Sequence, residues 1–463
     1  MSTPSWSLRS LSAALQAGEI LSTDIVAECV ARIEQLDPQL GAFVTVFADR
    51  AMDAARHRDR ERADGIVHGP LHGIPLGIKD LIATDEGVTT AQSQALEPEW
   101  GDIGDGEAVG RLRAAGAIVL GKLSTLEFAG GALAADNPFP RPRNPWDLDR
   151  WAGGSSSGSG VAVAAQLVPA ALGTDTGGSI RCPAALTGVT GLKPTYGLIS
   201  MTGICPAGWS FDTVGPMARS VWDCAALFEV MAGIPVLEGL RDDIDGLRIG
   251  VDRSLISGCE DADAMLEARF EAALDVLRGR GARLVDITVP FLQELGDVTQ
   301  LECLAEAYAW HRTRLRDRWD DYGPSIRRSL LTGLLLSSGD KVQLDRVRTV
   351  AGRSVRAAFA DLDAVVMVSA HAGAPLESEV GRNGGRFTSF WAPWNAVGYP
   401  ALSVPMGVGA SGMPLGLQII ARPSRDAMTL RVGHAFQSDT PWHLETPPAL
   451  SARGRASGGG DAA

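Results

Sequence analysis

The sequence predicts a large α/β fold, and three observations lead to that expectation. Short apolar segments alternate with helical patterns around residues 107–121 and again across residues 247–290. With 463 residues and 45% hydrophobic side chains, the chain can bury a sizeable core. Residues 153–181, rich in Gly, Ser and Ala, join two polar turns through an apolar segment. Together these features predict one large domain over residues 1–450.

Residues 7–62 are predicted to be mainly helical. Leucines recur at helical spacing up to Gly18, and a second apolar series follows the N-cap candidates at residues 22–24 and ends before Pro38. The highly charged segment 48–64 is expected to be a solvated helix that serves only as scaffold.

The sequence predicts no metal site. His68 and His72 are four residues apart, but Gly69 and Pro70 lie between them and break the helix that such a pair of ligands would need. The six cysteines show neither C-x-x-C spacing nor a Cys/His ligand pattern, so they are expected to be small buried residues. No cofactor is expected.

A strand, a helix and a second strand follow. The apolar run that ends at Lys79 is read as a buried strand, and residues 107–115 and 117–121 are read as a helix and a strand. The motif G-A-I-V-L-G-K-L fits the Walker phosphate-binding pattern until Leu123, which replaces the Ser or Thr that binds Mg²⁺. Because the interior of this motif is also a strand, nucleotide binding is not expected.

Two glycine- and serine-rich turns form the candidate catalytic centre. The first, G-G-S-S-S-G-S-G, leads into a helix of Gly, Ala and Val, whose small side chains allow close packing against neighbouring backbone. The second, T-D-T-G-G-S-I-R, places Gly177 and Gly178 directly before Ser179. Two residues without Cβ leave successive N–H groups free to form an anion-binding nest. Ser179 therefore has candidate oxyanion donors beside it.

Lys79 is the candidate base. Only four of the 42 basic residues are lysines, so this sequence generally uses arginine where a positive charge suffices. Burial lowers the pKa of a lysine because it disfavours the charged form, whereas arginine keeps its proton. Burial could therefore keep the Lys79 amine neutral near pH 7. A lysine that reaches solvent, or that pairs with Asp80, fits the same local pattern.

Four motifs, in this order and spacing, resemble the amidase signature family of Ser-cisSer-Lys hydrolases. They are G-I-P-L-G-I-K-D, G-G-S-S-S-G-S, G-T-D-T-G-G-S-I-R and G-L-K-P-T-Y-G, and they fall within about residues 70–220. The resemblance implies a central mixed, twisted β-sheet sandwiched by helices. It also implies that Lys79, Ser155 and Ser179 are the catalytic residues and that the peptide bond before Ser155 is cis.

The resemblance further implies an acyl-enzyme mechanism. Ser179 would attack the carbonyl carbon of an amide, and its proton would pass through Ser155 to neutral Lys79. The oxyanion is expected to lie among the backbone N–H groups of Thr176, Gly177, Gly178 and Ser179. The positions of the two turns are expected to be fixed by Ser156, Thr174, Asp175 and Arg181.

A different interpretation of the first turn stays open. Residues 154–158, G-S-S-S-G, satisfy the G-x-S-x-G elbow of α/β-hydrolases with Ser156 as nucleophile, and several histidines occur downstream. However, a strongly apolar strand should lead into such an elbow, whereas D-L-D-R-W-A precedes this one. We therefore favour the lysine-based centre.

The C-terminal half continues the α/β pattern. A strand from Leu247, a helix over residues 263–278 and a strand over residues 283–290 predict a parallel crossover. Residues 291–360 are predicted to be a helical layer over part of the sheet. Further short strands are predicted over residues 363–369, 401–406 and 416–421.

A segment rich in glycine and aromatic residues, 381–400, is predicted to be a loop. In the family the corresponding region borders the substrate pocket, so four side chains are candidates for binding an apolar or aromatic group, with ordinary core packing as the alternative. They are Phe387, Phe390, Trp391 and Trp394. The tail, residues 451–463, has no apolar residue larger than Ala and is predicted to be disordered.

Charge and hydropathy restrict the partners. A net charge of −13 argues against nucleic acid or an anionic membrane as the main partner, because both demand a basic surface. No run of about 18 apolar residues and no N-terminal signal pattern is present, so a cytoplasmic location is predicted. The expected partner is a small-molecule amide, and a homodimer is left open.

The family resemblance implies an amidase that releases a carboxylate and ammonia or an amine. Two alternatives use the same centre. One is the ammonia-releasing component of a tRNA-dependent amidotransferase, which frees ammonia from glutamine for a partner enzyme. The other is a hydrolase of carbamates, ureas or esters. The aromatic segment and the lack of a basic docking stretch favour a stand-alone amidase.

Overall fold

The structure is a computed structural model that describes residues 6–448, apart from 102, 132–136, 257–258, 260 and 381–387. The predicted disordered tail, residues 451–463, and the pocket candidate Phe387 lie outside the described residues. Among the described residues, no helix combines the length and apolar character needed to cross a bilayer.

Eleven strands form one β-sheet in the order β1-β3-β2-β4-β6-β5-β10-β11-β9-β7-β8. Their bounds are β1 Phe43–Val46, β2 Pro75–Lys79, β3 Ile118–Leu123, β4 Ala170–Asp175, β5 Thr190–Lys193, β6 Thr213–Ala218, β7 Arg248–Asp252, β8 Arg283–Ile287, β9 Ala364–Val368, β10 Ala401–Val408 and β11 Pro414–Ile420. β2 pairs in parallel with β3 and β4, and β7 with β8 and β9, whereas the other pairs are antiparallel. The predicted mixed sheet and the parallel crossover are confirmed.

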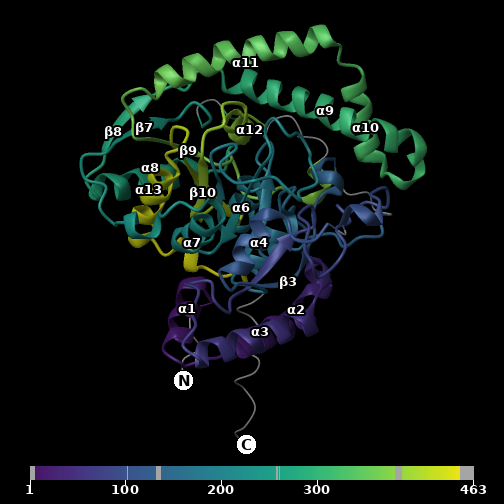
Figure 1. The fold of residues 1–463 in the computed structure, drawn as a ribbon. Helices are drawn as coiled ribbons and strands as arrows, with labels where there is room; N and C mark the ends of the chain where they lie inside the picture. The colour runs from purple at the N-terminus through teal and green to yellow at the C-terminus, as the bar shows by residue number, and fades with distance from the viewer. Residues whose placement is uncertain are drawn as a thin grey trace, which may run out of the picture.

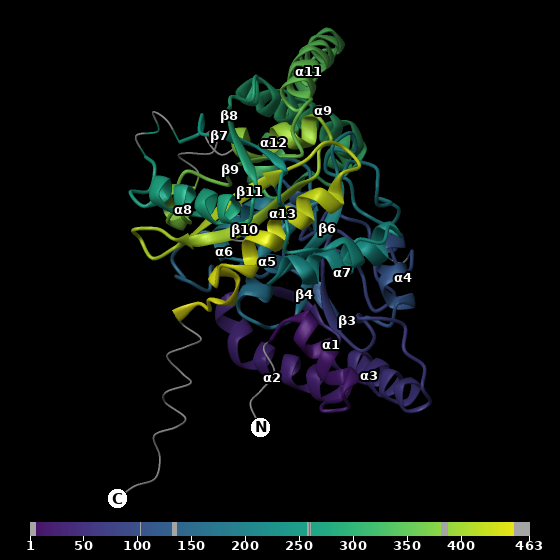
Figure 2. The same ribbon diagram turned by 90° about the vertical axis from the view of Figure 1, so that its left-hand side faces the viewer.

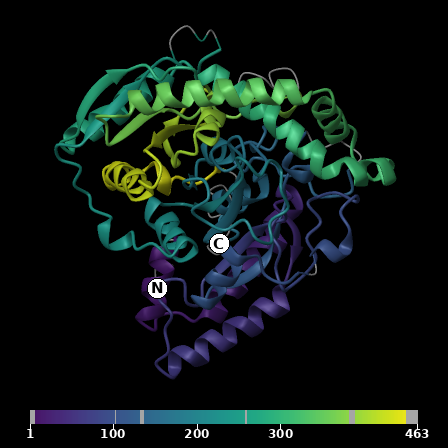
Figure 3. The ribbon, with the colours of Figure 1, turned by 45° about the horizontal axis from the view of Figure 1, so that its top comes forward.

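The helices cover this sheet and cap its two ends. Their bounds are α1 Leu8–Gln16, α2 Ser22–Leu40, α3 Ala48–Ala63, α4 Glu107–Ala114, α5 Ser157–Ala164, α6 Arg181–Thr187, α7 Val221–Ala232, α8 Leu266–Gly279, α9 Leu292–Asp317, α10 Pro324–Leu334, α11 Ser338–Ala358, α12 Thr388–Ala396 and α13 Asp426–Ser438. α9, α10 and α11 lie together at one end of the molecule, and α1, α2 and α3 lie at the other (Figures 1 and 2). The predicted helical layer is thus present, and α11 extends across it as one long helix (Figure 3).

The N-terminal region differs from the prediction in two details. A four-residue strand, β1, interrupts the predicted helical region and pairs with β3. A strand of four residues is too short to show a clear alternation of apolar and polar side chains, so its pairing with β3 determines its conformation. α2 also continues past Pro38 to Leu40 before Gly41 adopts a positive φ of 61°. Pro38 removes one backbone hydrogen bond, the one its own N–H would donate to Glu34, and the helix ends two residues later.

The two candidate turns meet at one edge of the sheet. β2 ends at Lys79 and its parallel neighbour β4 ends at Asp175, so the carboxyl ends of both strands lie side by side. α5 is buried throughout its length. A Cβ on Gly158 in this helix would lie 2.5 Å from the carbonyl oxygen of Ala42, which explains why such a small residue is needed there. Close helix packing therefore places the first turn against the end of β2.

Residues 388–396 form α12, so the loop predicted over residues 381–400 is wrong for this part. Phe390, Trp391 and Trp394 are all buried. α12 packs against α9, and the Thr299 hydroxyl of α9 lies 3.1 Å from the carbonyl oxygen of Ala392. Burial of these aromatic side chains between α9 and the sheet outweighs the local preference of a Pro- and Gly-containing segment for a loop.

Candidate active site

Lys79 lies in direct contact with the serines of the first turn. Its side chain is fully buried, and Nζ lies 2.8 Å from Ser155 Oγ and 3.0 Å from Ser156 Oγ. A third contact, also at 2.8 Å, joins Nζ to Thr174 Oγ1 on β4. Asp80 instead pairs with Lys122, with its carboxylate 3.2 Å from that amine. The structure therefore places Lys79 neither in solvent nor in an ion pair with Asp80.

The surroundings of Lys79 favour a neutral amine near pH 7. Burial lowers the pKa of Lys79 to about 7, although the carboxylates of Asp175 and Asp212 act in the opposite direction. A neutral amine has two N–H groups and one lone pair. The Ser156 hydroxyl donates to the Thr174 carbonyl at 3.1 Å, so it accepts a hydrogen bond from Lys79. If the second N–H donates to Thr174 Oγ1, the lone pair faces Ser155.

The first turn holds Ser155 beside the buried Lys79 amine and is itself hydrogen-bonded to the second turn. The peptide bond between Gly154 and Ser155 is cis. The backbone N–H of Ser156 donates to the carbonyl oxygen of Ser179 at 3.1 Å, which holds the two turns together. Ser155 is almost fully buried, whereas Ser179 is only partly buried. Of the three predicted catalytic residues, Ser179 is thus the one accessible to a substrate.

A buried ion pair fixes the second turn. Arg181 and Asp175 are both fully buried, and their charged groups lie 2.9 Å apart. Burial alone raises the pKa of Asp175, but the Arg181 guanidinium outweighs it and holds this pKa below its usual range. The carboxylate also accepts hydrogen bonds from the backbone N–H groups of Gly178 at 2.8 Å and Ile180 at 3.1 Å. The Arg181 guanidinium also donates hydrogen bonds to the side-chain oxygens of Asn395 and Gln418 and to the carbonyl oxygen of Trp391.

One predicted oxyanion donor already has a partner within the protein. The N–H of Gly178 donates to the Asp175 carboxylate at 2.8 Å. The physical reason is the tight turn, in which the carboxylate satisfies the amides that follow it. The N–H groups of Thr176, Gly177 and Ser179 remain as the candidate donors.

Gly178 is expected to tolerate no side chain. Its φ is 120°, and a Cβ would lie 2.5 Å from the Cβ of Trp391. Gly178→Ala should therefore displace the turn together with the neighbouring donors, the N–H groups of Gly177 and Ser179, and lower kcat by about 10²- to 10³-fold, the cost of losing one such donor. Gly177→Ala is the matched control, because its Cβ would meet only Ala392, at 3.9 Å. Steady-state kinetics of both variants test this, and equal effects on kcat would contradict it.

The structure separates the aromatic pocket candidates. Trp391 lies against Gly178 in the second turn, and Phe390 stacks on His371 with ring centroids 5.6 Å apart. Trp394 is fully buried and packs edge-on against Phe359, in a hydrophobic cluster between the sheet and α11. Trp391 therefore directly contacts the second turn.

Sequence reasoning missed the residues that support the turns from a distance. Asp212 accepts a hydrogen bond from the Thr176 hydroxyl at 2.5 Å and another from the backbone N–H of Gly208. Asn395 donates to the Asp175 carboxylate at 2.9 Å, and Gln418 accepts from Arg181 at the same distance. No local pattern marks these residues, because they come from distant segments that only the sheet brings together.

Two rejected motifs and one cavity are not part of the site. The Walker-like motif contains β3, as predicted. Ser156 forms hydrogen bonds with Lys79 and Thr174, and within the described residues no histidine is among its hydrogen-bond partners.

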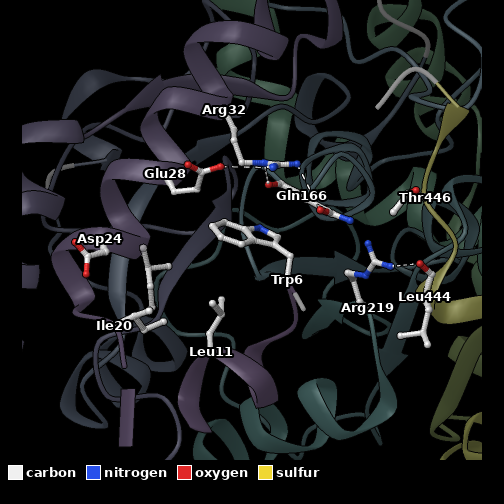
Figure 4. A pocket seen from close by; sticks show the side chains of 11 residues that line it. Trp6, Leu11, Ile20, Asp24, Glu28, Arg32, Gln166, Arg219, Leu444 and Thr446 are labelled. Carbon is white, nitrogen blue, oxygen red and sulfur yellow. Dashed lines mark hydrogen bonds and ion pairs between the residues drawn. The ribbon is translucent and has the colours of Figure 1, made fainter. Parts of the chain in front are cut away.

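A cavity of about 760 Å³ lies between α1, α2 and the segment around Leu444, and Lys79, Ser155 and Ser179 do not line it (Figure 4).

The mixed sheet with a buried lysine and two serine-bearing turns defines a hydrolase of carbon–nitrogen bonds. The chain belongs to the Amidase family, whose pattern matches residues 24–430. The predicted family, fold class and activity class are thereby confirmed.

Individual relatives include both amidases and one component of an amidotransferase. The chain is 39% identical to the A subunit of the glutamyl-tRNA(Gln) amidotransferase from Roseiflexus sp. (strain RS-1), over 94% of this chain and 96% of that protein. The peptide amidase of Stenotrophomonas maltophilia has a similar structure, with a TM-score of 0.80 and 31% identity over 96% of this chain and 98% of that one. A chain of a vestigial protein complex, described as revealing the evolutionary origins of an s-triazine catabolic enzyme, gives a TM-score of 0.86 and 32% identity, over 93% of this chain and 98% of that one.

Proposed function

We propose that this protein is a stand-alone amidase that hydrolyses a small linear amide through an acyl-enzyme on Ser179. The observation that carries the proposal is the contact of 2.8 Å between the buried Lys79 amine and Ser155 Oγ, beside the turn that bears Ser179. An amine whose pKa burial lowers to about 7 can accept a proton at neutral pH.

In the first half-reaction, Ser179 Oγ attacks the amide carbonyl and a C–O bond forms. The Ser179 proton passes to Ser155, whose own proton passes to Lys79. The N–H groups of Thr176, Gly177 and Ser179 bind the oxyanion. When the tetrahedral intermediate collapses, the C–N bond breaks and the proton returns through Ser155 to the leaving nitrogen.

In the second half-reaction, water attacks the Ser179 ester. Lys79 again accepts a proton through Ser155, and it returns this proton to Ser179 as the carboxylate product leaves. The protein's own residues supply every proton transfer, so the scheme includes no cofactor. The substrate in this proposal is a free small molecule in the cytoplasm, consistent with a net charge of −13, which disfavours nucleic acid and anionic membranes.

A second candidate function is that of the ammonia-releasing component of a tRNA-dependent amidotransferase. It is favoured by the relative that is 39% identical over nearly the full length of both proteins. That function requires glutamine as the ammonia donor and a partner enzyme as the acceptor. The stand-alone proposal is supported by the likeness to the peptide amidase structure.

A substrate panel separates these functions. The purified chain alone is incubated with a primary amide, an anilide, a carbamate, an ester and glutamine, and ammonia, amine or alcohol release is measured. Turnover of the primary amide or anilide by the chain alone supports the amidase. Activity confined to glutamine supports the amidotransferase component, and activity confined to the carbamate or ester supports the third alternative.

A fluorophosphonate is expected to modify Ser179 and no other serine. The phosphorus forms a bond to Oγ, and fluoride leaves. Peptide mapping by mass spectrometry should locate the adduct on Ser179, and Ser179→Ala should abolish labelling. Ser156→Ala is the matched control and should still be labelled, because Ser156 is buried and contacts Lys79 only as a hydrogen-bond acceptor. An adduct on Ser156 would favour the α/β-hydrolase elbow.

A further inference from the structure

Three side chains of the types that can bind metal ions, Glu61, His68 and His72, lie close together near the start of β2, at the opposite end of this strand from Lys79. Glu61 is near the end of α3, and His68 and His72 lie on the segment that joins α3 to β2. The ligand-capable atoms of these three residues all lie within 4.8 Å of one another. Neither the acyl-transfer scheme nor the family comparison uses this cluster.

The distances between these atoms approach those of a tetrahedral site. Glu61 Oε1 lies 3.6 Å from His68 Nε2 and 3.2 Å from His57 Nε2, one turn earlier on α3. Ligand bonds of about 2.0 to 2.1 Å to Zn²⁺ place neighbouring ligand atoms about 3.3 Å apart in a tetrahedron. The three ligand-capable atoms of Glu61, His68 and His72 lie within 4.8 Å of one another, so they would have to move closer together by up to about 1.5 Å to bind one ion.

The chain reversal that follows α3 is what assembles the cluster. Gly65 and Gly69 have positive φ values of 80° and 110°, which suit glycine and turn the chain back. His72 consequently packs against α3, with its Nε2 3.0 Å from the carbonyl oxygen of Arg58. The helix break at Gly69 and Pro70 rules out a helical pair of ligands, but it brings His72 close to Glu61 by another path.

One carboxylate and two guanidinium groups lie at the cluster, because Arg62 donates to the carbonyl oxygen of His72 at 3.0 Å and Arg58 pairs with Glu61. Arg58 forms an ion pair with Glu61 through Oε2, which leaves Oε1 to the two imidazoles. His72 is 1% exposed, and its Nδ1 is buried beside Gly116 with no hydrogen-bond partner among the described residues.

We propose that Glu61, His68 and His72 bind one Zn²⁺ ion. Imidazole and carboxylate are a common ligand set for zinc. The ion would tie the α3–β2 segment to α3 and so fix where the chain begins the strand that ends at Lys79. Its role is structural, because β2 separates it from the reacting groups.

Metal binding by the full-length chain, without a polyhistidine tag, tests this proposal. The protein is treated with EDTA, dialysed, and titrated with ZnCl₂ in a calorimeter, and Co²⁺ serves as a spectroscopic probe of tetrahedral geometry. We expect one Zn²⁺ per chain and a higher unfolding temperature with Zn²⁺. Glu61→Gln and His68→Ala should each weaken binding by about 100-fold or more, beyond the usual effect of losing an outer-shell partner.

His434→Ala is the matched control. His434 is 3.2 Å from Asp242 and lies in a different part of the fold, so this variant should bind Zn²⁺ as the wild type does. The side chains of Glu61 and His68 are partly exposed, so their variants should fold, and their unfolding temperatures without Zn²⁺ check this. Failure of the wild type to bind one Zn²⁺, or unchanged affinity in both ligand variants, would overturn the proposal.

Discussion

Lys79→Met is expected to lower kcat/KM for amide hydrolysis by about 10³- to 10⁴-fold at pH 7, because it removes the proton acceptor for both serines. Methionine has similar length and no charge, so it fills the buried site without stranding an ammonium group. The fold should therefore persist, as measured by circular dichroism and thermal unfolding.

Lys341→Met is the matched control for this prediction. Lys341 is a partly exposed lysine of α11 that pairs with Asp345 and Glu302, far along the chain from the two turns. Its replacement should leave kcat/KM unchanged. If Lys79→Met kept activity within about tenfold of the wild type while folded, the assignment of Lys79 as the base would be wrong.

Arg181→Met is expected to lower the free energy of unfolding by about 3 to 5 kcal/mol, because it leaves the Asp175 carboxylate buried without its cation. Activity should fall as well, since Asp175 accepts the N–H of Gly178 and so shapes the second turn. Urea unfolding monitored by fluorescence gives the change in stability.

The double variant Asp175→Asn, Arg181→Met identifies the cause of that loss. It removes the uncompensated charge, so it should be more stable than Arg181→Met alone, and the two single effects should not add. A loss of less than about 1 kcal/mol for Arg181→Met, or strict additivity of the two substitutions, would contradict the role given to this ion pair.

Local patterns predicted the parts of the site that local structure builds. The apolar run before Lys79 is a buried strand, and the small residues after the first turn form a buried helix. The serine and glycine turns lie where strands and helices meet, so their positions follow from the elements on either side. These features depend on neighbours in the sequence, and sequence reasoning therefore found them.

The rest depends on contacts between distant segments. α12 is helical because it packs between α9 and the sheet, although its sequence contains Pro393 and the local pattern predicts a loop. The N–H of Gly178 is taken by Asp175, a detail of turn geometry that the Gly-Gly pair does not reveal. Asn395 and Gln418 meet Arg181 only because α12 and β11 lie beside the second turn.

The histidine cluster shows the same limit. Gly69 and Pro70 correctly indicate the end of a helix, but the direction of the chain after this break comes from packing against α3. The sequence pattern alone could exclude a helical pair of ligands and could not exclude the cluster that the reversed chain forms with Glu61.

The most direct test of the account is the pH dependence of Ser179 modification by a fluorophosphonate, measured from about pH 5 to about pH 10 with the wild type and Lys79→Met. Because only the neutral amine accepts a proton, the wild-type rate constant should rise with pH, with an apparent pKa of about 7, and then level off. Lys79→Met should react slowly and lack this rise. A wild-type profile that is flat, or that rises only near the ordinary lysine value of 10.5, would contradict the central claim that a buried, neutral Lys79 drives the two serines.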